Sequence, residues 1–369
     1  MTAADHRHMA HALELARRGF YSTHPNPRVG CVIVQGEEIV GTGFHHHAGG
    51  PHAEVGALAA AGGRARGATA YVTLEPCSHH GRTPPCADAL VAAGVARVVF
   101  AAADSNPRVA GGGRARLESA GIAVTGGVLA AESRALNRGF FSRMERGRPF
   151  VTLKLGMSLD GKVALASGAS QWVTGEDARA DVQRLRAASD CVLTDIGTVR
   201  ADDPGLDVRD PRFDLGPRLQ LRTVLDTRLA LSPRAKLLTR PGRTLVFSGV
   251  AELDAIRALE AAGAEVEVIG RGPDGVALPA ALTRLAAREV NDVLVEAGPR
   301  LAGAFVAARL VDEFVLYVAP KLFGHTAQSG FEFADPGALA RAPELEILSC
   351  DRIGSDLRVV ARPRPSAPT

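Results

Sequence analysis

Residues 75–86 read Glu-Pro-Cys-Ser-His-His-Gly-Arg-Thr-Pro-Pro-Cys, and residues 50–54 upstream read Gly-Pro-His-Ala-Glu. Together the two stretches supply one imidazole, from His52, and two thiols, from Cys77 and Cys86. A closed structural zinc site uses four protein ligands, so three ligands leave one position open for water. The two stretches therefore predict a catalytic zinc site, although each of these residues taken alone would ordinarily serve packing or face solvent.

The surrounding sequence predicts where these ligands lie in the fold. Cys77 follows an apolar strand expected over 70–74, and Cys86 begins an expected helix. His52 and Glu54 are two residues apart and cannot share one face of a helix, so His52 must lie at a helix entry. We expect the Glu54 carboxylate to move protons at the metal site.

Composition and charge narrow the class of protein. The chain has 369 residues, of which 46% are hydrophobic and 22% charged, and this length suggests two globular domains. With 43 basic and 40 acidic residues the net charge is only +3, which argues against a nucleic-acid partner. The first twenty residues lack an apolar segment, so we expect no signal peptide, no membrane span and a cytoplasmic location. The five cysteines are an odd number, which indicates thiols or metal ligands and not a disulfide framework.

Both halves of the chain alternate helical and strand-like patterns, which is typical of α/β folds. Residues 143–149 are charged and contain Gly and Pro, so we place a domain boundary there. We predict one domain over 1–147, a second over 148–362, and a Pro-rich disordered tail over 363–369. Strands are expected in the second half at 150–155, 191–194, 221–225, 244–247, 265–269, 293–295 and 314–318.

Several longer motifs resemble the RibD family of bifunctional riboflavin biosynthesis enzymes. In the first half these motifs are 23–30, 50–54, 72–79 and 81–86, and in the second half 149–155, 158–161, 170–174, 185–187 and 201–204. Deaminases that act on cytidine or tRNA adenosine share the His-x-Glu element but usually place two residues between the cysteines. Here eight residues intervene between Cys77 and Cys86, which argues against a nucleoside or tRNA substrate.

For the first domain, the resemblance implies a cytidine-deaminase-like three-layer fold and hydrolytic deamination of 2,5-diamino-6-(5-phosphoribosylamino)pyrimidin-4-one. It implies one Zn²⁺ held by His52, Cys77 and Cys86, with Glu54 as the catalytic proton carrier. Asn26 and the loop at 82–83 are candidate substrate contacts, or else an ordinary turn and a solvated loop.

For the second domain, the resemblance implies a dihydrofolate-reductase-like α/β fold that reduces the ribosyl group to ribityl with NADPH. No Gly-x-Gly-x-x-Gly motif follows a strand, so the cofactor is implied by the resemblance alone. The residues that match the family's substrate contacts are Ser170, Arg186, Leu206, Arg209 and Glu296. Those that match its cofactor contacts are Gly156, Trp172, Thr198, Asp202, Thr227 and Gly298.

Some of these residues can also be interpreted as structural or solvent-exposed residues without a role in the site. Lys154 is a candidate catalytic residue, because lysine in an apolar strand is unusual, or else it is an edge-strand lysine that reaches solvent. Arg186 and Arg209 are candidates to clamp a substrate phosphate, or else solvated charges. Trp172 stacks on nicotinamide or fills the core. Asp195 stands where relatives usually carry Gly or Ser, and its carboxylate would repel a cofactor phosphate unless it points away.

Other residues outside the zinc site are expected to be structural. Cys31, Cys191 and Cys350 are interpreted as core residues, and the consecutive histidines 45–47 as a polar rim and not a second metal site. The predicted partner is the small phosphoribosyl pyrimidine, and a homo-oligomer is left open. Two rival functions are a nucleoside or tRNA deaminase with an accessory nucleotide-binding domain, and a structural zinc domain fused to a nucleotide-binding module.

Overall fold

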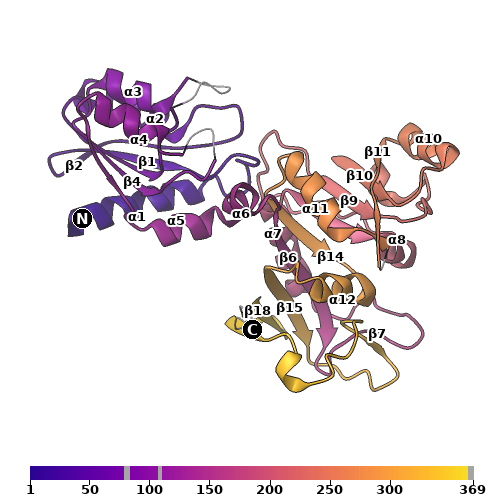
Figure 1. Cartoon of the computed structure of the whole chain (residues 1–369). Helices are drawn as coiled ribbons and strands as arrows, with labels where there is room; N and C mark the ends of the chain where they lie inside the picture. Colours follow the sequence, from indigo (N-terminus) through magenta and orange to yellow (C-terminus); the bar gives the residue numbers. More distant parts are fainter. Residues whose placement is uncertain (79–83, 107–109, 274, 365–369) are drawn as a thin grey trace. The chain divides into compact units, whose positions relative to one another are not determined.

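The computed structural model describes residues 1–78, 84–106, 110–273 and 275–364 (Figure 1). The candidate substrate loop at 82–83 therefore lies outside the described residues. The chain forms two compact units, Met1–Gly147 with Asp214–Arg218, and Arg148–Phe213 with Leu219–Thr369. Within the described residues, no helix is long and apolar enough to cross a membrane.

The first unit is built on a five-stranded sheet of order β2-β1-β3-β4-β5. Strand β1 pairs antiparallel with both β2 and β3, whereas β3, β4 and β5 run parallel. The strands are β1 (Gly30–Gln35), β2 (Glu38–Phe44), β3 (Thr69–Leu74), β4 (Arg97–Ala102) and β5 (Ala123–Gly126).

Helices cover both faces of this sheet and make three layers (Figure 1). One face packs on α1 and α5 through a core that contains Met9, Val32 and Val99. The other face packs on α2, α3 and α4 through a core that contains Ile33 and Leu90, among others. The helices are α1 (Ala3–Arg17), α2 (Ala53–Ala61), α3 (Cys86–Ala93), α4 (Gly112–Ser119), α5 (Ala130–Leu136) and α6 (Arg138–Arg146), with the 3₁₀ turn η1 at Gly62–Ala65.

Two glycines of β2 let α2 lie directly on the strand. A Cβ at Gly41 would stand 2.3 Å from the Ala57 carbonyl oxygen, and one at Gly43 would stand 2.3 Å from the Ala53 carbonyl oxygen. Real Cβ atoms essentially never approach so closely, so any other residue would push the helix away. This contact sets the position of the helix whose first turn carries Glu54.

Helix α1 is anchored by Asp5, which forms a capping box with Thr2. The buried Asp5 carboxylate accepts hydrogen bonds from Arg97 at 2.8 and 3.1 Å and from the Tyr71 hydroxyl at 3.2 Å. The Arg97 guanidinium lowers the pKa of the Asp5 carboxyl, despite its burial. Asp5 therefore ties α1 to β3 and β4.

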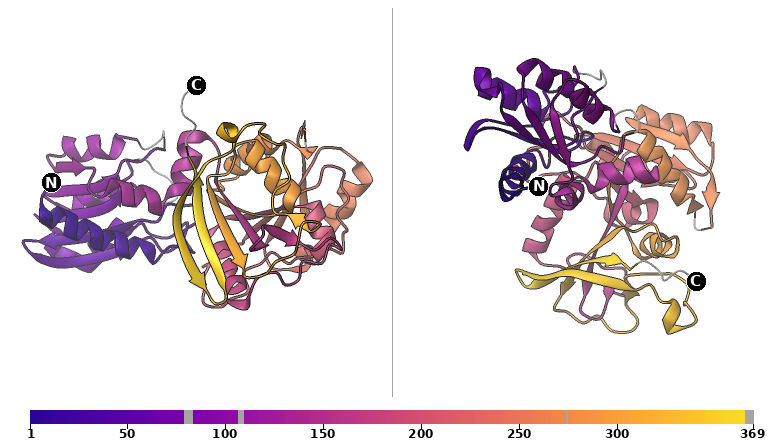
Figure 2. Two further views of the ribbon diagram at one scale, coloured as in Figure 1. Left: turned by 90° about the horizontal axis from the view of Figure 1, so that it is seen from below. Right: turned by 60° about the vertical axis from the view of Figure 1, so that its left-hand side comes forward.

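The second unit is built on a nine-stranded sheet of order β11-β10-β9-β8-β14-β6-β15-β18-β17. The strands from β11 to β15 in this order run parallel, and β18 and β17 complete the sheet as an antiparallel hairpin at its edge (Figure 2). The strands are β6 (Phe150–Ser158), β8 (Cys191–Asp195), β9 (Leu221–Leu225), β10 (Arg243–Ser248), β11 (Ala264–Val268), β14 (Asp292–Glu296), β15 (Glu313–Ala319), β17 (Leu345–Ile353) and β18 (Asp356–Pro363).

Helices again cover both faces. Helices α11 and α12 pack with the largest core cluster on one face, and α7, α8, α9 and α10 pack on the other. The helices are α7 (Glu176–Ala188), α8 (Ile196–Asp202), α9 (Lys236–Thr239), α10 (Leu253–Ala261), α11 (Leu278–Ala287) and α12 (Pro299–Ala307). The short elements are β7 (Lys162–Ala164), β12 (Arg271–Gly272), β13 (Gly275–Val276), β16 (Gln328–Ser329) and the 3₁₀ turn η2 (Leu339–Arg341).

The C-terminal region corrects two expectations. Strand β18 includes Pro363, which was expected to begin the disordered tail, whereas residues 365–369 lie outside the described residues. Cys31 and Cys191 are buried as expected, but Cys350 is exposed on β17, so the core interpretation is wrong for Cys350. Most side chains of β17, which lies at the edge of the sheet, are exposed.

Candidate functional site

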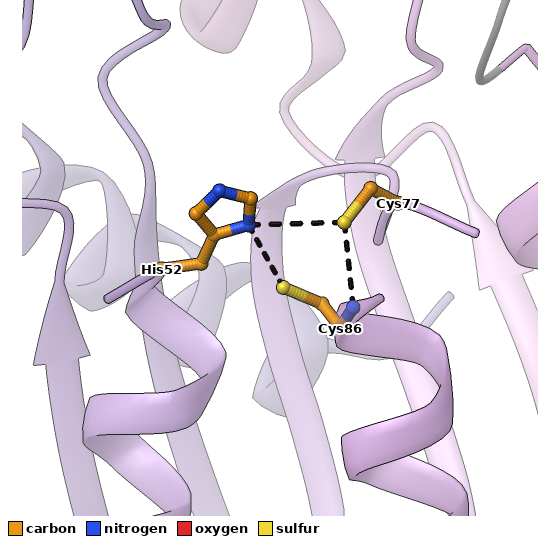
Figure 3. A group of neighbouring side chains, drawn as sticks. All are labelled: His52, Cys77 and Cys86. Atoms are coloured by element: carbon orange, nitrogen blue, oxygen red, sulfur yellow. Dashed lines mark hydrogen bonds between the residues drawn. The ribbon is translucent and has the colours of Figure 1, made fainter. Parts of the chain in front are cut away.

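The imidazole of His52 and the thiols of Cys77 and Cys86 converge in the first unit (Figure 3). Nδ1 of His52 lies 3.0 Å from Sγ of Cys86 and 3.7 Å from Sγ of Cys77, and all three atoms lie within 4.8 Å of one another. Tetrahedral zinc with the usual bond lengths would separate such a nitrogen and sulfur by about 3.6 Å. The three side chains thus fit a zinc ion with small adjustments.

The N-termini of two helices position these zinc ligands. His52 is the N-cap of α2, and Cys86 is the first residue of α3. The backbone N–H of Cys86 donates to Sγ of Cys77 at 3.3 Å, and the N–H of Ala87 donates to the Cys77 carbonyl at 3.1 Å. Contacts with Cys86 and then His52 lower the pKa of the Cys77 thiol to about 4. Proximity to Cys77 raises the pKa of the Cys86 thiol.

Glu54 lies in the first turn of α2 and is only 4% exposed. Burial raises the pKa of its carboxyl, and the neighbouring His52 opposes that shift. Its carboxyl also interacts with the Cys86 thiol, which places it at the ligand cluster. A buried carboxyl beside a metal site, with its pKa moved toward neutrality, suits proton transfer.

The candidate substrate contact Asn26 is hydrogen-bonded to His45, a histidine whose burial the sequence did not predict. Nδ1 of His45 lies 3.0 Å from the Pro51 carbonyl and must donate to it, so Nε2 accepts from the Asn26 amide at 3.0 Å. His45 is 3% exposed, so the polar-rim interpretation is wrong for this residue. Its only signal in the sequence is its place in the run of three histidines.

In the second unit, Lys154, Arg186 and Glu296 form one charged cluster. Lys154 on β6 is in register with Glu296 on the neighbouring β14, and its Nζ lies 3.9 Å from the carboxylate. Arg186 on α7 donates two hydrogen bonds to that carboxylate, at 2.6 and 3.1 Å, and a third to the Asp207 carbonyl at 3.1 Å. Strand β6 lies between β14 and β15, so Lys154 is not an edge-strand lysine.

The charges in this cluster influence one another. Burial lowers the pKa of the Lys154 ammonium, and Glu296 partly offsets that effect. Burial disfavours ionisation of Glu296, but the charges of Arg186 and Lys154 outweigh it and lower the carboxyl pKa. Three of the five N–H donors of Arg186 are thus hydrogen-bonded within the protein, so it is not a solvated charge, and its contact with the substrate phosphate stays a prediction.

Four candidate contacts meet in pairs: Thr198 and Asp202 belong to α8, Gly298 is the N-cap of α12, and Ser170 lies between β7 and α7. The Thr198 hydroxyl accepts from the Gly298 backbone N–H at 3.1 Å, so these two positions meet. The Ser170 hydroxyl donates to the Asp202 carboxylate at 3.3 Å. Ligands of open α/β sheets bind beyond the carboxyl ends of the strands, where Thr198 and Gly298 lie.

The remaining candidates are more dispersed. Trp172 is 64% exposed, and the Arg179 guanidinium lies 4.7 Å from its ring centre, so the core interpretation is wrong. Arg209 is also exposed, with its guanidinium 3.9 Å from Asp207. The other candidates are Leu206, which is buried with φ +53°, Gly156 within β6, and Thr227 just beyond β9.

Asp195, the departure from the family pattern, is the N-cap of α8. Its carboxylate accepts from the Thr198 backbone N–H at 2.8 Å. The carboxylate is thus turned onto the helix start and satisfies one of its unpaired donors. It nevertheless leaves a negative charge beside the candidate cofactor residue Thr198.

Comparisons with known proteins identify a family for each of the two units. Residues 2–102 match the cytidine and deoxycytidylate deaminase zinc-binding region, and residues 149–359 match the RibD C-terminal domain. The riboflavin biosynthesis protein RibD of Escherichia coli is 47% identical over 367 residues, which cover 96% of this chain and 98% of that protein. The RibD of Haemophilus influenzae is 44% identical and covers 96% of each chain.

Solved structures give the same result. Acinetobacter baumannii RibD superposes with a TM-score of 0.90 at 44% identity, over 98% of this chain and 99% of that one. A Thermotoga maritima structure described as a diaminohydroxyphosphoribosylaminopyrimidine deaminase and 5-amino-6-(5-phosphoribosylamino)uracil reductase has a TM-score of 0.84 at 33% identity, over 98% and 99% of the chains. The chain therefore belongs to the RibD family, with a zinc-binding deaminase domain followed by a reductase domain of riboflavin biosynthesis.

Proposed function

We propose that residues 1–147 deaminate 2,5-diamino-6-(5-phosphoribosylamino)pyrimidin-4-one and that residues 148–362 then reduce its ribosyl group to ribityl. The observation that carries the proposal is the ligand cluster at His52 with the buried Glu54 beside it. The two activities named for the Thermotoga maritima relative support the choice of substrate.

In the first step, His52, Cys77 and Cys86 would hold zinc, which supplies Lewis acidity that makes water nucleophilic at neutral pH. Glu54 accepts the proton of the attacking water on its carboxylate and returns it to the departing amine, so that ammonia leaves. General acid–base transfer of this kind contributes roughly 10² to 10⁴ in rate. Asn26 keeps its amide oxygen for the pyrimidine, because its nitrogen is bonded to His45.

In the second step, the second unit would hold NADPH, which would supply a hydride to C1 of the sugar as the bond from C1 to the ring oxygen breaks. Lys154, which Glu296 holds beside it, stabilises the negative charge that develops on the sugar oxygen. Arg186 orients Glu296, and the exposed Arg209 is the better candidate for the phosphate. The proposed cofactor contacts are Gly156, Trp172, Thr198, Asp202, Thr227 and Gly298, and the other proposed substrate contacts are Ser170 and Leu206.

The decisive experiment is Glu54→Gln, with Glu37→Gln, an exposed glutamate in the β1–β2 turn, as the control. We expect the Glu54 variant to keep one zinc and to lose at least 100-fold in ammonia release, because its amide cannot carry the proton. NADPH oxidation with the deaminated substrate should be unchanged, since the reductase cluster lies in the other unit. Unchanged ammonia release would refute the role of Glu54, and loss of both activities would refute separate sites.

The same assay separates the rival functions. A nucleoside deaminase would release ammonia from cytidine, and a structural zinc domain would be indifferent to Glu54→Gln. We also propose a cytoplasmic location and no nucleic-acid partner. Self-association into a homo-oligomer stays a prediction, which light scattering of the purified chain tests.

A further inference from the structure

Glu75 is a buried acid next to a candidate metal ligand, and the proposed reaction gives it no role. It is 4% exposed and lies between the end of β3 and Pro76-Cys77. Its carboxylate accepts three backbone N–H groups. Oε2 lies 3.3 Å from the nitrogens of Asp104 and Gly111, and Oε1 lies 3.1 Å from that of Arg114.

Two of these donors belong to the start of α4. Gly111 is the N-cap of this helix and has no side chain that could accept from the first turn. The first N–H groups of a helix lack partners within the helix, and a carboxylate is favourable there. Glu75 thus caps α4 from another element and holds it against the end of β3.

The first turn of α4 also lies directly on the segment that carries Cys77. A Cβ at Gly113 would stand 1.7 Å from the Pro76 carbonyl oxygen, and one at Gly112 would stand 2.4 Å from Oγ of Ser78. Pro76 and Ser78 are the two neighbours of Cys77 in the chain. The backbone in the first turn of α4 therefore packs tightly against the residues on both sides of Cys77.

Helix α3 holds Cys77 through two hydrogen bonds, one to its sulfur and one to its carbonyl. We infer that Glu75 is a positioning residue for the zinc ligand Cys77. By fixing α4 against the segment 76–78, it keeps Sγ of Cys77 at a metal-binding distance from His52. This inference rests on the proposed zinc site.

The placement of the carboxylate distinguishes positioning from simple helix capping. An ordinary Ser or Asp at the N-cap would stabilise the helix start without involving another element. Here the cap comes from the residue two before the ligand, and glycines at 112 and 113 permit the close approach. Loss of Glu75 should therefore disturb the metal geometry while the unit stays folded.

The test compares two substitutions in the full-length chain that disturb this contact in different ways. Glu75→Gln removes the charge of the cap, and Gly113→Ala keeps the Glu75 carboxylate but forces α4 away from Pro76. Their matched controls are Glu118→Gln, an exposed glutamate on the same helix, and Gly63→Ala, where a Cβ meets nothing within 4 Å. Zinc affinity is measured by chelator competition, and the ligand geometry by the thiolate-to-cobalt absorption of the Co²⁺-loaded chain.

Both substitutions should weaken zinc binding by about 10-fold or more, the usual range for groups that orient metal ligands. Both should also shift the cobalt spectrum, while the controls match the parent chain. Zinc affinity within twofold of the parent and an unchanged spectrum in folded Glu75→Gln would overturn the inference. If that variant melts below the assay temperature, Gly113→Ala decides by the same criteria. A parent chain that binds no zinc would instead refute the proposed zinc site.

Discussion

The contact between β2 and α2 makes Gly43→Ala a quantitative test of how the first site is positioned. The new methyl group would stand 2.3 Å from the Ala53 carbonyl oxygen and 2.6 Å from the Ala57 nitrogen. Ordinary contact begins near 3.4 Å, so α2 must move outward by about 1 Å. His52 and Glu54 move with it, because they lie at the start of this helix.

A displacement of about 1 Å can cost roughly 100-fold in catalysis. We therefore expect the rate of ammonia release to fall about 100-fold in Gly43→Ala, and the free energy of unfolding of the first unit to fall by about 1–3 kcal/mol. NADPH oxidation with the deaminated substrate should not change. The assay follows ammonia and NADPH separately in one full-length preparation.

The control is Gly56→Ala, on the opposite side of the same contact. A Cβ there would lie 3.7 Å from the Cα of Gly43, which is ordinary contact. This variant should keep its deaminase rate and gain up to about 1 kcal/mol, because alanine favours a helix over glycine. Equal deaminase rates in Gly43→Ala and the parent chain would refute the claim that this contact positions the catalytic turn.

Three further outcomes are expected. Arg186→Lys should lower the kcat of NADPH oxidation by about 10-fold or more, because lysine cannot hold Glu296 bidentately; a raised KM for the phosphorylated substrate with unchanged kcat would instead show a phosphate contact. Asp195→Ser keeps an N-cap but removes a charge, so the Kd for NADPH, measured by fluorescence titration, should fall about threefold to tenfold. Asp5→Asn should cost the first unit about 2 kcal/mol at pH 7, measured by hydrogen exchange at α1. Because folding lowers the pKa of Asp5, this difference should persist above about pH 4 and shrink as the pH falls through the lowered value.

Much of the fold was accessible from the sequence because its signals are local. The helix expected to begin at Cys86 is α3, and the strand expected over 70–74 matches β3 to within one residue. The hairpin of β17 and β18 was not predicted, because nearly all of β17 is exposed and shows no apolar alternation.

The site was predictable where its residues share short motifs and not where they meet through the fold. His52 and Glu54 are two residues apart and together form the His-x-Glu element, which can be recognised in the sequence. By contrast, Arg186 meets a carboxylate 110 residues away in the chain, and Glu75 meets a backbone N–H 39 residues away. No local pattern distinguishes such a buried pair from a solvated charge.

The register between β6 and β14 limits which insertions the reductase cluster can tolerate. Neighbouring residues of a strand point to opposite faces, so one residue inserted in β6 before Lys154 would turn its ammonium to the other side of the sheet. Two inserted residues would restore the face but shift the side chain along the strand by about 6.6 Å. Neither change leaves Lys154 opposite Glu296. Length variation in this part of the chain is therefore compatible with the cluster only in the loops outside these strands.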